Sequence, residues 1–202
     1  MATVPFGYPR EMPSEQSTDL LDSLKVAAAA LREAKISFAL AGGLAAWAHG
    51  GPPTEHDIDL MIRAEDAELA LGTLRDAGLP VASPPEGWLV KAWHGDVLID
   101  LMFAPKGILI DDDFLDRCPV VNVAAVDMRV VPLDDLLVSK LLALTEHNLD
   151  FGPPLEWARA IREQVDWASV RARTDDSPFA RTFLFMLDEL GVAPGRDTFA
   201  DR

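Results

Sequence analysis

The sequence predicts an α+β fold, in which a mixed β-sheet is flanked by helices and followed by a C-terminal helical bundle. Short apolar runs that end at glycines, prolines or turn residues, at 36–41, 58–62 and 97–103, are typical of strands. Longer segments with apolar residues at helical spacing lie between and after these runs. The final part of the chain contains only segments of the second kind, so we expect the sheet to be built from the earlier part.

This pattern divides the chain into an N-terminal arm at 1–13, a core at 14–131 and a helical region at 132–202. The arm has three prolines and little periodicity, so we expect an extended segment. Helices of the last region are expected at 133–147, 155–164, 166–173 and 177–190. Large apolar residues of the last three are expected to be core: Trp157, Ile161, Val165, Trp167, Phe179, Phe183 and Leu187.

The composition is that of a globular protein with a strong acidic excess. Of 202 residues, 49% are hydrophobic and 25% charged, and the formal net charge is −15. Such acidity disfavours indiscriminate nucleic-acid binding, although it leaves room for a local basic patch. The single cysteine, Cys118, excludes an internal disulfide. Because we find no signal-peptide pattern and no apolar run near the ~18 residues of a membrane span, we expect a cytoplasmic protein without membrane contact.

Two helices are expected within the core. The first begins near Ser14 or Ser17 and continues to Ala34, with apolar residues recurring at helical spacing. The second covers Glu65 to Ala77 and is closed by Gly78, a residue type that commonly follows a helix end.

Two acids interrupt the apolar strand at 58–62. Asp57 and Asp59 lie two residues apart, so their side chains point to the same side of a strand. Carboxylates held side by side repel each other unless a cation lies between them, and hard oxygen ligands suit Mg²⁺. Alternatively, Asp57 opens the strand at the surface and Asp59 lies on a solvated face.

A glycine pair precedes these acids. The strand at 36–41 ends in Gly42-Gly43, and a short helical segment at 44–49 follows before the turn at 50–53. Such a turn brings backbone N–H groups to an anion and lets a phosphate approach without a Cβ clash. A simple tight turn is the other interpretation of the pair.

A hairpin is expected from 88 to 103, with its turn at His94-Gly95-Asp96. Asp100 lies inside the second, otherwise apolar strand, where an unpaired acid is unfavourable. Asp100 is therefore our candidate for a third carboxylate and a general base, unless an arginine or backbone N–H groups satisfy it. Asp96 is its competitor, although it has the character of a turn residue.

Two further segments complete the core. The acidic run at 111–113 is interpreted as a solvated loop or a helix N-terminus, in preference to a metal cluster. Strands are expected at 120–126 and 128–131, on either side of Asp127.

The helix at 133–147 carries a lysine within its apolar stripe. Lys140 is seven residues after Leu133, so it falls on the face expected to be buried. Either its ammonium group extends past the edge of the core to water, or it reaches a negative ligand such as a triphosphate.

Gly42-Gly43 followed by Asp57-Ile58-Asp59 resembles the signature of the nucleotidyltransferase (polymerase-β-like) superfamily. The resemblance implies the fold of that superfamily, with the glycine turn holding nucleotide phosphates and the aspartate pair binding Mg²⁺. A third acid on a later strand completes the site in that family, a place that Asp100 would take.

The segment Leu-x-x-Leu-x-x-x-Lys-Leu at 133–141, followed by Asp150, is similar to later motifs of the AbiEii-like branch, which includes toxins of toxin–antitoxin pairs. This resemblance implies that Lys140 contacts the nucleotide and that Asp150 assists near the acceptor or positions Lys140. Asp150 could otherwise be a turn residue or an N-cap before the next helix.

The resemblance implies transfer of a nucleoside monophosphate from an NTP to an acceptor hydroxyl, for which we first expect a tRNA 3′ end, with an antitoxin protein as partner. A small aminoglycoside- or lincosamide-type acceptor is the second hypothesis. A nucleotide-binding module without catalysis is the third. It is motivated by two departures from the family pattern: Gly43 stands where other members have a hydroxyl residue, and no arginine precedes Asp57.

Overall fold

A single mixed sheet forms the centre of the molecule. The computed structural model describes residues 15–54 and 57–193, so the predicted arm at 1–13 lies outside the described residues. The sheet has seven strands in the order β3-β4-β5-β2-β1-β7-β6. Their bounds are β1 Phe38–Ala41, β2 Ile58–Ile62, β3 Val81–Ala82, β4 Leu89–His94, β5 Val97–Met102, β6 Val120–Val123 and β7 Val126–Val130.

The central strands run in both directions. β1 and β2 are antiparallel, whereas β2 pairs with β5, and β1 with β7, in parallel. The outer pairs β4–β5 and β6–β7 are antiparallel hairpins. Every residue of β1 is buried, as expected for a strand covered on both faces.

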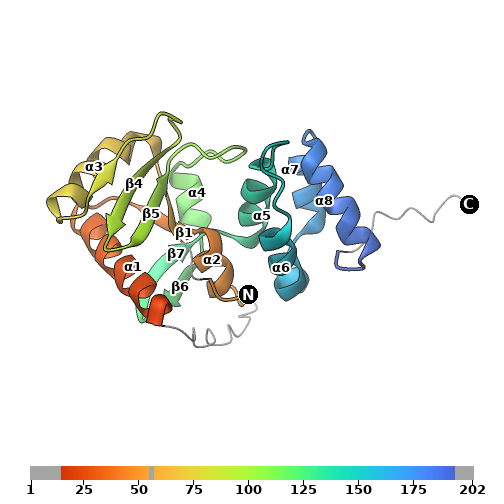
Figure 1. The fold of residues 1–202 in the computed structure, drawn as a ribbon, viewed down its shortest axis with the longest axis horizontal. Helices are drawn as coiled ribbons and strands as arrows, with labels where there is room; N and C mark the ends of the chain where they lie inside the picture. The colour runs from red at the N-terminus through yellow and green to blue at the C-terminus, as the bar shows by residue number, and fades with distance from the viewer. Residues whose placement is uncertain (1–14, 55–56, 194–202) are drawn as a thin grey trace, which may run out of the picture.

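Helices cover the sheet and then form the C-terminal part (Figure 1). The α-helices are α1 Glu15–Glu33, α2 Gly42–Ala48, α3 Ala67–Asp76, α4 Asp112–Arg117, α5 Leu133–Leu142, α6 Gly152–Ile161, α7 Trp167–Thr174 and α8 Pro178–Glu189. Single 3₁₀ turns, η1 Ala64–Asp66 and η2 Arg162–Gln164, extend two of them. Among the described residues, no helix combines the length and apolar character needed to cross a membrane.

The helices fall into two groups. α1 and α3 pack side by side, α1 against β5 and α3 against β4. α2 contacts β1 and β2 on one side and α5 on the other, and α5 contacts α6, α7 and α8. α2 and α5 therefore join the sheet to the C-terminal helices, and the α+β prediction is confirmed.

The predicted helix at 133–147 is too long. α5 ends at Leu142, and the chain then forms a tight turn in which Thr145 and Asn148 exchange backbone hydrogen bonds of 3.1 Å in both directions. This turn takes backbone groups that a continuing helix would need, so the chain leaves the helix axis before Asp150.

The boundary between the strands near residue 125 also differs from the prediction. Asp127 lies inside β7, and the turn of the β6–β7 hairpin is Ala124-Ala125, with φ angles of 50° and 67°. Two consecutive residues with positive φ form the kind of turn that suits a twisted hairpin. Alanine is uncommon there, which is why the sequence pattern missed it.

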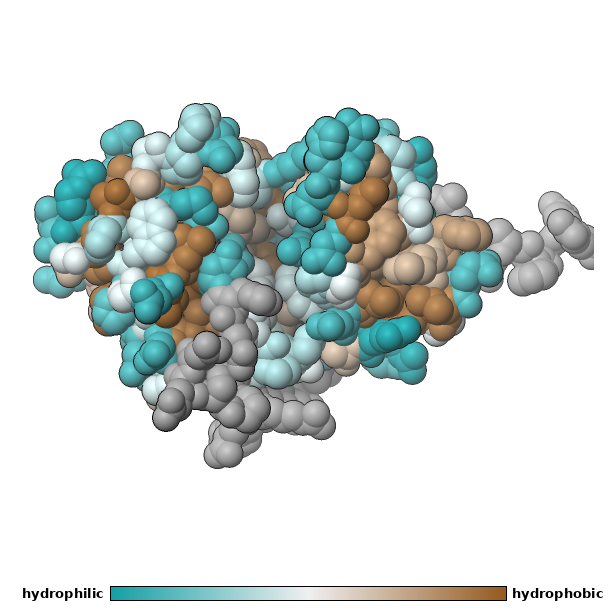
Figure 2. All heavy atoms as spheres, viewed as in Figure 1, coloured by the Kyte–Doolittle hydropathy of each residue, from teal (hydrophilic) through white to brown (hydrophobic). Residues whose placement is uncertain are grey.

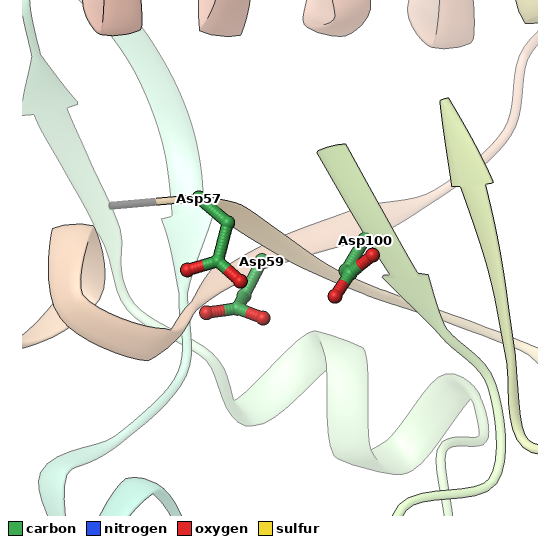
Figure 3. Close-up of side chains that lie close together, drawn as sticks. All are labelled: Asp57, Asp59 and Asp100. Carbon is green, nitrogen blue, oxygen red and sulfur yellow. The ribbon is translucent and has the colours of Figure 1, made fainter. Parts of the chain in front are cut away.

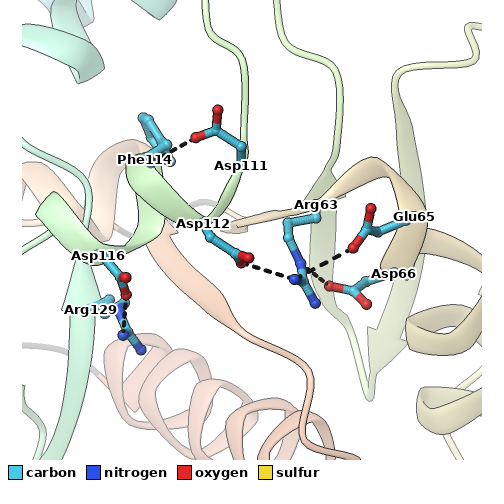
Figure 4. Close-up of polar contacts among 8 residues, drawn as sticks. All are labelled: Arg63, Glu65, Asp66, Asp111, Asp112, Phe114, Asp116 and Arg129. Carbon is cyan, nitrogen blue, oxygen red and sulfur yellow. Dashed lines mark hydrogen bonds and ion pairs between the residues drawn. The ribbon is translucent and has the colours of Figure 1, made fainter.

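The acidic run at 111–113 is a helix N-terminus, as expected (Figure 4). Asp111 caps α4 by accepting a hydrogen bond of 2.8 Å from the backbone N–H of Phe114. Asp112 accepts one of 2.9 Å from Arg63, which also pairs with Asp66. These acids stabilise the fold and do not form a metal cluster.

Candidate active site

Three carboxylates meet where β2 lies beside β5. Asp57 immediately precedes β2, Asp59 is its second residue and Asp100 is on β5 (Figure 3). One oxygen of each carboxylate lies within 4.8 Å of the others. The predicted convergence of these acids from separate points of one sheet is therefore present.

Strand register explains the convergence. Asp59 is the direct partner of Asp100 in the parallel β2–β5 pair, and Lys91 on β4 is the partner of Asp100 on its other side. Ala41, the last residue of β1, is opposite Asp59. Because directly paired residues point to the same face of a sheet, one row across four strands carries a lysine, two acids and the start of the glycine turn.

The electrostatics of this row favour a bound cation. Burial, together with the neighbouring carboxylates of Asp57 and Asp100, raises the pKa of Asp59 to about 7, although Lys140 and Lys91 act in the opposite direction. Burial also raises the pKa of Asp100, against the lowering effect of its bond with Lys91. Like charges in adjacent registered positions are unfavourable unless a cation or a proton is shared between them. The donor set, all carboxylate oxygen, fits Mg²⁺.

The glycine turn is shaped by its neighbours. Gly42 has a φ of 58°, and a Cβ atom built on it would lie 1.7 Å from Oδ2 of Asp59. A Cβ on Gly43 would lie 2.7 Å from Oγ1 of Thr54. Glycine is therefore required at 42 both by backbone conformation and by the space that Asp59 fills, and at 43 by the side chain of Thr54.

The turn and two of the acids open into a cavity of about 850 Å³ between the sheet and the C-terminal helices. Figure 2 shows the surface hollowed between these two parts. Its charged lining consists of Asp57, Asp59, Asp150, Glu156, Lys106 and Lys140. Its apolar wall includes Trp88, Met61, Met102 and Trp157. Asp100 is beside the first two acids but is not part of the lining.

Lys140 is exposed in the last turn of α5, which agrees with both alternatives for a lysine in the apolar stripe: an ammonium group that extends past the edge of the core, or one that reaches a ligand. The apolar stripe of α5 is buried at Leu133, Leu136 and Leu141, but the cavity opens at its last turn. The Lys140 ammonium lies 6.0 Å from the ring centre of Trp157. It therefore faces the space that a negative ligand would enter, and its charge lowers the pKa of Asp59.

Asp150 lines the same cavity and also has a local role. Its Oδ1 accepts a hydrogen bond of 2.9 Å from the backbone N–H of Gly152, at the start of α6. This is the turn chemistry that was the alternative interpretation, and it holds the side chain at the cavity wall. Asp96 is exposed in the β4–β5 turn and is absent from the carboxylate cluster.

Lys91 is the residue that sequence reasoning missed. Its Nζ donates hydrogen bonds of 2.8 and 3.2 Å to the two carboxylate oxygens of Asp100. The signal was present in the hairpin: if His94 pairs with Val97, counting three residues back from His94 and three forward from Val97 places Lys91 opposite Asp100.

The fold is shared with solved nucleotide-transferring enzymes. The antibiotic-resistance factor ANT(2'')-Ia superposes with a TM-score of 0.52 at 17% identity, covering 88% of this chain and 95% of the other. The lincosamide antibiotic adenylyltransferase LnuA, in a lincomycin-bound structure, gives 0.51 at 14% identity, covering 75% and 98%. At such identities the likeness establishes the fold alone. No curated protein sequence matches the chain.

A family model fixes the class. The model described as "Nucleotidyl transferase of unknown function (DUF2204)" matches residues 20–175. This range includes the glycine turn, the three carboxylates, Lys140 and Asp150. The family description does not name the AbiEii-like branch, so that assignment stays a prediction from the later motifs. The chain belongs to this family of nucleotidyltransferases.

Proposed function

We propose that the protein transfers a nucleoside monophosphate from an NTP to a hydroxyl of a small, positively charged acceptor, with Mg²⁺ held by the carboxylates of Asp57 and Asp59 beside Asp100. The single observation that carries this proposal is the convergence of the three carboxylates within 4.8 Å, beside a turn that lacks side chains. When bound there, Mg²⁺ would offset the negative charge that develops on the phosphate oxygens during transfer.

The residues of the chain have separate tasks in this reaction. Gly42 and Gly43, at the start of α2, would offer backbone N–H groups to the phosphates. Lys140 places a positive charge on the cavity wall, where it would offset the charge of the leaving pyrophosphate. A new bond forms between the acceptor oxygen and the α-phosphorus, and the bond from that phosphorus to the β-phosphate oxygen breaks. The acceptor proton would pass to the carboxylate cluster, in which Asp100 is the base expected from the sequence.

The cavity supports a small cationic acceptor. Its volume of about 850 Å³ is within the usual range for small-molecule sites. Asp150 and Glu156 on the cavity wall are distant in sequence from the carboxylate triad and add negative charge where an acceptor would lie. A cationic molecule with hydroxyl groups matches this lining, and it also matches the formal net charge of −15.

An RNA acceptor, expected first from the sequence, is the second candidate. Lys140 and Asp150 do line one cavity, in keeping with the resemblance to the toxin branch. An RNA would dock on the C-terminal helices, where the structure describes five arginines. Four of them are engaged within the fold: Arg162 with Glu163, Arg171 with Asp188, Arg173 with Asp135, and Arg181 with the carbonyl of Asp175. The fifth, Arg159, is exposed. The engagement of the other four reduces the basic surface available for phosphates, and it lowers the RNA hypothesis below the small-molecule one.

The test is a transfer assay with each α-labelled NTP and Mg²⁺, offered in parallel to aminoglycosides, lincosamides and total tRNA. We expect label on a cationic small molecule. Labelled tRNA, with a yield that falls steeply with salt, would replace our proposal with the toxin hypothesis. Label on no acceptor, together with absent Mg²⁺-dependent NTP binding, would support the inactive-module hypothesis. Asp22→Ala, which removes an exposed acid of α1 outside the cavity lining, should label the same acceptor as the wild type.

A further inference from the structure

An ion pair with Lys91 neutralises the carboxylate cluster at one end, where Asp100 lies. Nζ of Lys91 lies 2.8 Å from one Asp100 oxygen and 3.2 Å from the other. The side chains are 28% and 12% exposed, so the pair is largely withdrawn from water. Because the two residues are direct partners in the β4–β5 hairpin, the sheet itself keeps the ammonium group at this place.

The other end of the cluster has no such cation. Within the part of the chain that the structure describes, neither Asp57 nor Asp59 forms an ion pair within 4.0 Å. These two acids are also the ones that line the cavity, whereas Asp100 does not. The negative charge that a bound cation would neutralise is therefore at Asp57 and Asp59.

The charges of the cluster support the same division. Three ionised carboxylates carry a formal charge of −3, which one divalent ion and the Lys91 ammonium would balance together. A second divalent ion at Asp100 would have to share its oxygens with an ammonium group already within hydrogen-bond distance of both. Two cations at that separation in a partly buried site repel each other strongly.

We infer that Lys91 is a built-in counter-ion that takes the place of a second metal at Asp100, so that the free enzyme binds one divalent ion, at Asp57 and Asp59. This inference rests on the proposed metal-dependent transfer and adds to it a positioning residue and a metal stoichiometry. Lys91 acts through Asp100, whose carboxylate it holds in a fixed orientation beside the metal-binding pair.

The experiment consists of two titrations of the full chain. Binding of Mn²⁺ alone is measured by electron paramagnetic resonance, and binding of Mg²⁺ alone is measured by calorimetry. We expect one ion per chain in the wild type and in Lys91→Arg, which keeps the charge. Lys91→Met should acquire a second ion and bind the first roughly tenfold more tightly, because the competing cation is gone. Lys25→Met removes the same charge from the exposed face of α1, where Lys25 pairs with Asp22, and should behave as the wild type.

Circular dichroism in EDTA establishes that each variant is folded before titration. The inference is overturned if Lys91→Met binds the same number of ions with the same affinity as Lys25→Met, or if the wild type binds two ions without nucleotide. These outcomes differ from failure of the proposed function. If the wild type binds neither Mn²⁺ nor Mg²⁺ and transfers no label, both the proposed function and the inference are overturned. If the wild type transfers label but Lys91→Met gives the same titration as the wild type, the inference alone is overturned.

Discussion

Within the described residues, two acids are buried, Asp100 and Asp135, and their surroundings are opposite in kind. Asp135 on α5 is 1% exposed and lies between two arginines, with distances of 2.5 Å to Arg117 and 2.6 Å to Arg173. In the cluster of Asp57, Asp59 and Asp100, by contrast, carboxylates face one another and a single lysine pairs with one of them.

The difference teaches how to separate a structural acid from a functional one. Asp135 is neutralised by side chains from α4 and α7, so it joins three helices and needs nothing from outside. Among the described residues, an ion pair balances the charge of the carboxylate cluster at Asp100 only. Burial of an acid is common to both places, and only the nature of the neighbours distinguishes them.

The largest expected effect is on catalysis. Asp57→Ala or Asp59→Ala should lower transfer roughly a thousandfold or more while the protein stays folded, since the ligands of the metal are removed. The measurement is the initial rate of label transfer, with circular dichroism as the check on folding. Full activity in either variant would remove the cluster from the active site and erase the contrast with Asp135.

Asp135→Ala should act on stability instead. The substitution removes two charge-assisted hydrogen bonds from Arg117 and Arg173, which are partly exposed, so we expect a loss of about 3 kcal/mol in the free energy of unfolding. Urea denaturation measures it. Asp116→Ala is the matched control, because Asp116 pairs with Arg129 at the surface, and it should lose less than about 1 kcal/mol. A similar loss in both variants would contradict the structural role of Asp135.

Asp59→Asn should stabilise the metal-free protein at alkaline pH. Since folding raises the pKa of Asp59 from 3.8 to about 7, the folded state holds a proton more tightly than the unfolded chain does. The contribution of the protonated Asp59 carboxyl to the free energy of unfolding is complete below pH 3.8. It is lost as the pH rises through 7. In EDTA at pH 8 the variant should therefore gain roughly 2–4 kcal/mol over the wild type, and little at pH 4. An equal gain at both values would show that the pKa of Asp59 is unchanged by folding.

The smallest expected effect is metal-dependent stabilisation of the wild type. At a Mg²⁺ concentration a hundred times Kd, unfolding should become harder by about 2.7 kcal/mol. Thermal melts with Mg²⁺ and with EDTA measure the difference. Asp57→Ala should abolish it, and Asp116→Ala should retain it. Stabilisation that survives in Asp57→Ala would place the metal elsewhere.

Much of the fold and the acidic cluster could be predicted from the sequence, because both depend on short-range periodicity. Alternation in strands places Asp57 and Asp59 on one side, and an acid inside an apolar run marks Asp100. Pairing across strands was harder, although the hairpin turn contained the register that brings Lys91 to Asp100.

Other features could not be predicted because local pattern does not report them. The residues after Leu142 contain no glycine or proline until Gly152, so nothing in the pattern marks the end of α5. Alanines at 124 and 125 conceal a turn that glycine or asparagine would have revealed. A helical wheel places Lys140 among leucines, but only the packing of neighbouring helices decides that a cavity opens there.

The close fit of Asp59 against Gly42 has a consequence for variation at this site. The carboxylate fills the volume that any larger residue at position 42 would need, at a Cβ distance of 1.7 Å. The glycine turn and Asp59 are therefore packed against each other, and any larger residue at position 42 would displace the carboxylate of Asp59. Libraries that aim to alter nucleotide choice should leave this pair intact and vary the apolar wall around Trp88 and Met102.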